Sequence, residues 1–131
     1  MYEVPLVTAG TVIQSTEWGN MVANAVTPTP WVDVTFQNSW VNQGAGFQAV
    51  QYRKVNDVVQ IRGNAKSGLT LNPMFTLPIG FRPLEEVTYV VDGDGTSTTS
   101  RVRVTSSGGV IPDASSNTEF EIGFIQFSDE A

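Results

Sequence analysis

The sequence contains no cysteine and no histidine. Without cysteine there is no disulfide framework and no thiolate nucleophile. Cysteine usage therefore does not indicate whether the protein works in an oxidising or a reducing compartment. Without histidine, the Ser/His/Asp and Cys/His triads and the usual zinc sites are excluded. These two absences remove most hydrolase mechanisms, so we expect no catalytic residue, no metal site and no cofactor.

Charged residues are also few, at 15% of the chain. Thirteen acidic and seven basic side chains give a net charge of -6, and all the basic residues lie between Arg53 and Arg103. An acidic protein repels phosphate backbones, so nucleic acid is not an expected partner. No apolar run approaches the roughly 20 residues that span a bilayer, and Met1-Tyr2-Glu3 lacks the basic start of a signal peptide. We therefore expect no membrane insertion.

The 131 residues divide into an N-terminal stem at 1–30 and one β domain at 31–131. In the stem, Ser15 is a suitable N-cap for a short helix over residues 15–26, and Pro28 and Pro30 form a stiff link after it. The helix carries an apolar stripe that consists of Trp18, Met21, Val22, Ala25 and Val26. A helix this short is marginal alone in water, so the stripe either folds back on the β domain or packs in an oligomer. The stiff link favours an oligomer interface.

From Trp31 onward, short runs of alternating apolar and polar residues are separated by turn residues. Residues 47–54 and 57–65 are expected to form a hairpin that turns at Asn56-Asp57. This spacing predicts a mainly β fold, an antiparallel, jelly-roll-like β-sandwich of about eight strands, with one short N-terminal helix.

The alternation also predicts which side chains share a face. Val102 and Val104 are expected to point inward, which leaves Arg101 and Arg103 together outside. Two further sets are each expected to share one face of a strand: Val32, Val34 and Phe36 near the start of the β domain, and Phe120, Ile122 and Phe124 in its last strand.

The candidate ligand-binding residues, which are aromatic or basic, are Trp31, Trp40, Phe47, Arg101 and Arg103. The three aromatic residues border the loop 37–46, whose Gln, Asn and Gly residues could hydrogen-bond sugars. An aromatic face beside amides suits the C–H surface of a carbohydrate. The alternative for the tryptophans is packing in the core or between subunits, and the alternative for the arginines is a solvated face.

Two acidic patterns have both a chemical and a structural interpretation. Glu119 and Glu121 lie on the same face of a predicted strand and could catalyse glycoside hydrolysis as a carboxylate pair. Their period-2 spacing is also typical of a solvated strand face. The stretch 92–96 resembles the start of a calcium loop, but it lacks the third ligand position and the closing glutamate. A plain hairpin turn is favoured there.

One longer pattern resembles a known family. It consists of the strands at 50–53 and 59–63, then Phe75-Thr76-Leu77-Pro78-Ile79-Gly80-Phe81-Arg82-Pro83, with a tryptophan-bearing strand before them. This pattern resembles C-terminal modules of bacteriophage tail-fibre and related receptor-binding virion proteins, and the segments 9–13 and 18–20 are similar to N-terminal segments of such proteins. The resemblance covers about residues 9–83.

The resemblance implies a homotrimeric β-sandwich in the virion, often with binding to the host surface, and it carries over no ligand-contact residue. The expected function is a non-enzymatic tail-tip or fibre module that binds host-surface carbohydrate. Other phage virion proteins are its expected partners, in a particle assembled in the host cytoplasm. The first alternative is a capsid head-fibre, spike or decoration protein with a purely structural role, and the second is a carbohydrate-active enzyme.

Overall fold

The computed structural model of the protein describes residues 29–92, 99–114 and 116–129. These ranges contain nine β-strands in antiparallel sheets and no helix, which confirms the mainly β class. In chain order the strands are β1 (Val32–Asp33), β2 (Val41–Asn42), β3 (Gln51–Val55), β4 (Val58–Lys66), β5 (Phe75–Thr76), β6 (Val87–Val91), β7 (Ser100–Val104), β8 (Gly109–Asp113) and β9 (Phe120–Ser128). The helix predicted at 15–26 lies outside the described residues, and so does the interface predicted for Trp18, Met21, Val22, Ala25 and Val26.

The strand β4 is the centre of the five-stranded sheet. It pairs along one edge with β3 and β2 and along the other with β9, and β1 extends the sheet beyond β3. The β3–β4 hairpin turns at Asn56 and Asp57, as the sequence predicts. Asn56 has a φ of 55°, a left-handed conformation that asparagine adopts more readily than most residues.

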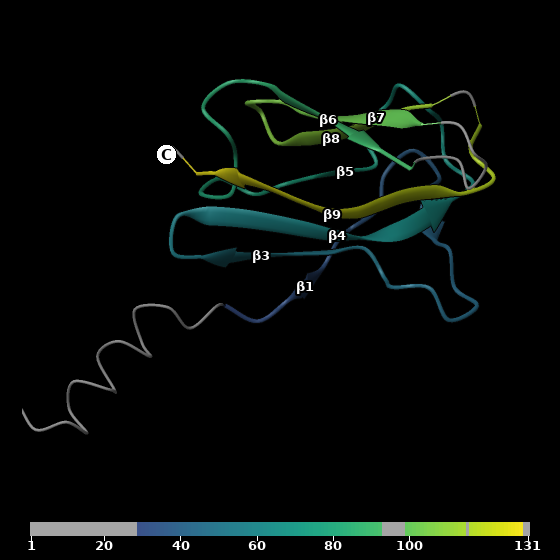
Figure 1. Ribbon diagram of the computed structural model, residues 1–131, viewed down its shortest axis with the longest axis horizontal. Helices are drawn as coiled ribbons and strands as arrows, with labels where there is room; N and C mark the ends of the chain where they lie inside the picture. Colours follow the sequence, from purple (N-terminus) through teal and green to yellow (C-terminus); the bar gives the residue numbers. More distant parts are fainter. Residues whose placement is uncertain (1–28, 93–98, 115, 130–131) are drawn as a thin grey trace, which may run out of the picture.

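The second sheet has four strands in the order β5-β8-β7-β6. Figure 1 shows it as a layer above β9, β4 and β3. Within it, Val102 and Val104 are fully buried, whereas Arg101 is exposed and Arg103 is half-buried. The predicted alternation of β7 is therefore confirmed.

The buried apolar side chains of both sheets form one cluster, to which β4 contributes Val59 and Ile61 and β7 contributes Val102. Aromatic rings also join the layers, since Tyr52 on β3 and Phe75 on β5 stack with their centroids 6.5 Å apart. The core therefore lies between the two sheets, and each sheet keeps one outer face.

A tyrosine forms a polar link between the same two layers. The hydroxyl of Tyr89 on β6 donates a hydrogen bond to the backbone carbonyl of Gln126 on β9, with an oxygen–oxygen distance of 2.5 Å. Burial raises the pKa of Tyr89 above its ordinary value of 10.0, because the phenolate would be poorly solvated there.

Strand β9 contains a β-bulge opposite the middle of β4. Gly63 pairs with Gly123, but the next residue, Asn64, pairs with Glu121, so Ile122 is the extra residue. Gly123 has a φ of +71°, which glycine adopts without steric cost. The bulge shifts the inward and outward alternation of every side chain after it.

The bulge explains why one sequence-based prediction is wrong. Phe120 and Ile122 are buried as expected, but Phe124 is 53% exposed and Ile125 is buried in its place. Phe124 therefore lies on the outer face of the sheet, not beside Phe120 in the core.

The start of the β domain also differs from its prediction. Val34 and Phe36 pack against the core, but Val32 is 41% exposed because β1 is a two-residue strand at the edge of the sheet. Strand β2 lies in a segment that was expected to be loop.

Candidate functional site

Trp31 lies against two arginine side chains on the outer face of the five-stranded sheet. The guanidinium carbon of Arg62 is 3.9 Å from the centroid of the Trp31 ring, and that of Arg53 is 4.3 Å from it. Arg62 points away from the core because its neighbours Ile61 and Gly63 are buried. A guanidinium over an indole is attracted by the negative face of the ring. Trp31 therefore holds both guanidinium groups in place.

Glutamines opposite the arginines extend this contact into a network. The hairpin register places Gln51 opposite Arg62 and Gln60 opposite Arg53. Arg62 donates from Nε and Nη2 to Oε1 of Gln51 at 3.1 and 2.7 Å. Arg53 donates from Nε to Oε1 of Gln60 at 2.7 Å. Each arginine is thus positioned by a ring and by one side-chain amide.

The network continues to the neighbouring strands on both sides. Gln51 donates to Oδ1 of Asp33 on β1 at 2.8 Å, and Gln60 donates to Oε1 of Gln126 on β9 at 3.3 Å. Phe124 on β9 is the register partner of Arg62 and adds an exposed aromatic ring beside it. We name this surface the Trp31 face, and it consists of Trp31, Gln51, Arg53, Gln60, Arg62, Phe124 and Gln126.

The two arginines of the Trp31 face are not ion-paired within the described part of the chain. The ion pairs that join described residues are Lys54–Asp129, Arg101–Asp113 and Arg103–Glu86. Asp33 contacts the network through Gln51 rather than through an arginine. The Trp31 face therefore carries two guanidinium groups, with the Asp33 carboxylate as the acidic group at its border, on a protein whose net charge is -6.

Trp40 does not contribute a binding surface. It is 2% exposed, its ring packs edge-to-face against Phe120 at 6.2 Å, and its indole nitrogen donates to the carbonyl of Leu69 at 3.1 Å. The prediction of Trp40 as a ligand contact is wrong, and the packing alternative is confirmed for this residue.

Phe47 is exposed, as its role in the prediction requires. It lies in the loop before β3, where its backbone N–H donates to the carbonyl of Gly44 at 2.9 Å. The next residue, Gln48, donates to Oε1 of Gln51, so this loop borders the Trp31 face. The role of Phe47 in ligand binding stays a prediction.

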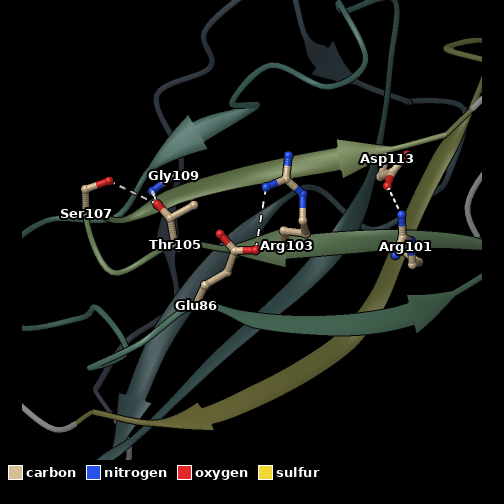
Figure 2. A network of polar contacts seen from close by, with 7 residues as sticks. All are labelled: Glu86, Arg101, Arg103, Thr105, Ser107, Gly109 and Asp113. Atoms are coloured by element: carbon tan, nitrogen blue, oxygen red, sulfur yellow. Dashed lines mark hydrogen bonds and ion pairs between the residues drawn. The ribbon is translucent and has the colours of Figure 1, made fainter.

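Arg101 and Arg103 lie together on the outer face of the four-stranded sheet, the side of the molecule away from the Trp31 face. Figure 2 shows that each of them meets an acidic side chain. Arg101 is 2.5 Å from Asp113 on β8, and Arg103 is 3.6 Å from Glu86, which precedes β6. The charges of Arg101 and Arg103 are therefore balanced by these carboxylates. Both arginines lie on a different sheet from the Trp31 face.

Surface pockets within the described part of the chain lie away from the Trp31 face. One, of about 320 Å³, is lined by uncharged residues of the loops beside Trp40, namely Gly68, Leu69, Thr70, Ser116 and Asn117. The other, of about 340 Å³, is lined by Pro83, Leu84, Glu85, Glu86, Val87, Phe127 and Ser128. Neither pocket contains an arginine or a lysine.

Among solved structures, the chain is similar to the receptor binding protein (gp15) of Listeria phage PSA, with a TM-score of 0.71 and 15% sequence identity. The match covers 88% of this chain and 73% of that one. This chain has the fold of a phage receptor-binding protein. The resemblance that the sequence pattern suggests is therefore confirmed at the level of the fold. No protein-family model matches the sequence, and no curated protein matches it either.

The described residues also bear on metal and membrane binding. No group of three acidic, histidine or cysteine side chains within them could hold a metal ion. In the same ranges, no helix has the length and hydropathy needed to cross a membrane.

Glu119, one of the two candidate glycosidase carboxylates, accepts a hydrogen bond from the Asn64 amide at 3.0 Å.

Sequence reasoning missed Arg53 and Arg62, although the signal was present. A two-residue turn at Asn56-Asp57 fixes the pairing of the hairpin, and counting back from it places each arginine opposite a glutamine on one face. The contact with Trp31 was not recoverable in this way, because it depends on where β1 joins the sheet.

Proposed function

We propose that the protein is a non-enzymatic component of a bacteriophage virion that binds the surface of the host cell. The observation that carries the proposal is the fold, which matches that of a phage receptor binding protein over 88% of this chain. The Trp31 face supports it at the level of a site, because a surface with amides, arginines and an exposed aromatic ring suits a carbohydrate.

The finer proposal is a homotrimer at the tail tip or fibre, with host-surface carbohydrate as its receptor and other virion proteins as its partners. We also propose that the two sheets form a jelly-roll-like β-sandwich. The single core between the sheets supports the sandwich. The apolar stripe predicted at Trp18, Met21, Val22, Ala25 and Val26 supports the trimer, because such a surface is stabilised when copies cover it.

Binding of the fluorescently labelled protein to intact bacterial cells tests the proposal. A panel of strains that differ in surface polysaccharide should include some that bind the protein, and purified polysaccharide from those strains should compete for it. A glycan array supplies the same measurement with defined sugars. Heat-denatured protein is the control for non-specific adhesion.

The alternative is a capsid spike or decoration protein with a purely structural role. It predicts incorporation of the labelled subunit into particles without binding to any strain or glycan. That result would overturn host binding. Cleavage of a polysaccharide by the wild type, lost in Glu119→Gln or Glu121→Gln, would overturn the non-enzymatic part of the proposal.

A further inference from the structure

We infer that the Trp31 face binds an anionic glycan, a polysaccharide that carries phosphodiester or carboxylate groups. Arg53 and Arg62 are its anion contacts, and Phe124 provides an apolar surface beside them. The inference rests on the proposed host-surface function and adds to it the class of ligand and the site.

Both arginines of this face keep unused hydrogen-bond donors. Arg53 uses Nε and Arg62 uses Nε and Nη2, which leaves both terminal nitrogens of Arg53 and one of Arg62 without a partner in the described ranges. The Oε1 atoms of Gln51, Gln60 and Gln126 already accept hydrogen bonds. A ligand that supplies acceptors would use these free guanidinium donors, and phosphate and carboxylate oxygens form the strongest hydrogen bonds with guanidinium groups.

The charges on this face lead to the same class of ligand. Two guanidinium groups that share one indole ring repel each other, and no described carboxylate pairs with either of them. An anion that contacts both guanidinium groups offsets this repulsion. Arg101 and Arg103 differ, because Asp113 and Glu86 already neutralise them.

The contacts of Trp31 disfavour a simpler arrangement in which a neutral sugar stacks on that ring. Guanidinium groups already occupy positions over that ring at 3.9 and 4.3 Å. Phe124 is the aromatic ring left exposed, and the β-bulge of β9 places it next to Arg62. A sugar C–H surface can rest on Phe124 while an anionic group of the same chain reaches the arginines.

The test is binding of soluble polymers to the full-length protein, measured by isothermal titration calorimetry. Poly(glycerol phosphate) presents phosphodiesters, polygalacturonate presents carboxylates, and dextran is the uncharged control. The wild type should bind at least one of the two anionic polymers, more weakly as salt rises, and should bind dextran much less. The polymer that binds identifies the anionic group.

A matched pair of double variants locates the site. Arg53→Gln with Arg62→Gln should weaken binding of the anionic polymer by roughly tenfold or more, as expected when charge-assisted contacts are lost. Arg101→Gln with Arg103→Gln removes the same charge from the opposite sheet and should change affinity less than about threefold. Equal losses in the two variants, or tighter binding of dextran than of both anionic polymers, would overturn the inference.

A measurement on the wild type keeps the inference testable if the first double variant does not fold. Titration with the bound polymer should shift the NMR signals of the Nε–H groups of Arg53 and Arg62 and leave those of Arg101 and Arg103 in place. Shifts confined to the second pair would overturn the site. A change in sedimentation of the folded first variant would also overturn it, because the face would then pack against another copy.

The same variants separate this inference from the proposed function. If the wild type binds host cells and the Arg53→Gln, Arg62→Gln variant binds them equally well, the site is wrong and host binding stands. If the wild type binds no strain of the panel but binds an anionic polymer through Arg53 and Arg62, host binding is wrong and the site stands.

Discussion

Gly68 shows how a single position in a loop controls a large core residue. A Cβ atom at this position would lie 2.1 Å from ring atoms of Trp40, which is less than any allowed carbon–carbon contact. The ring is buried against Phe120, so it has no free space into which to move. Glycine is therefore required here by the close approach of the indole.

We expect Gly68→Ala to lower the free energy of unfolding by about 3 kcal/mol, the upper part of the range for overpacking a core. The matched control is Gly44→Ala, where the φ of +73° disfavours a side chain but no atom lies within 4 Å of the added Cβ. That change should cost only about 1 kcal/mol. Urea unfolding followed by tryptophan fluorescence compares the two, and equal costs would show that Trp40 is not held by the close contact.

At the scale of the strand, the bulge in β9 gives two phenylalanines opposite roles. Phe124 is exposed on the Trp31 face, whereas Phe127, three residues later, is 7% exposed and belongs to the core. The alternation of the sequence alone would put Phe124 inside. It fails because a register shift depends on the pairing of β9 with β4, which is not a local property.

Alanine at these two positions measures the effect of the bulge. Phe127→Ala should cost about 3 to 5 kcal/mol of stability, the usual cost of removing a buried phenylalanine. Phe124→Ala should cost less than about 1 kcal/mol, as expected for a change that leaves no cavity. Thermal or urea unfolding of the two variants gives the answer. A larger cost for Phe124 would contradict the register of the structure.

The hydrogen bond from Tyr89 joins strands of different sheets and predicts a dependence on pH. Its pKa is raised in the folded protein by burial, so the folded state keeps this proton to a higher pH than the unfolded state does. The free energy of unfolding should therefore fall as pH rises above 10.0, the ordinary tyrosine value.

Tyr89→Phe isolates this contribution from other groups that titrate at high pH. The variant should be less stable than the wild type by roughly 1 kcal/mol at neutral pH, because it loses one hydrogen bond. The difference should narrow above pH 10.0, where only the wild type loses stability through this group. Urea unfolding of both proteins at neutral pH and above pH 10.0 measures the difference in the free energy of unfolding. A difference that is the same at the two pH values would contradict a raised pKa of Tyr89.

At the scale of the whole molecule, the prediction concerns assembly. If the protein is a homotrimer, sedimentation at micromolar concentration should give three times the 14.2 kDa mass of one chain. Trp18→Asp with Val22→Asp should weaken assembly and leave the β domain folded, because a charge without a partner is costly at an apolar interface. Wild-type sedimentation as a monomer would rule out the trimer. Normal assembly of the double variant would show that the predicted stripe is not the interface.

Some parts of the fold could be predicted from local sequence, and others could not because they depend on residues distant in sequence. The β3–β4 hairpin and the inward valines of β7 follow from local alternation and turn residues, and both are observed. The burial of Trp40 depends on Gly68 and Phe120, which are distant in sequence. The Trp31 face combines side chains of β3, β4 and β9 with the residue before β1, so composition and spacing could suggest its residue types but not their juxtaposition.

Among the described strands, the four-stranded sheet ends at β6, and the outer edge of this strand has consequences for solubility. A free edge offers backbone groups to which a second molecule can add a strand, the first step of aggregation. Glu85 precedes β6, and Asp92 follows it. If two copies joined antiparallel along this edge, Glu85 of each would meet Asp92 of the other. Like charges on facing strands repel, so acidic residues at both ends of β6 disfavour aggregation through it.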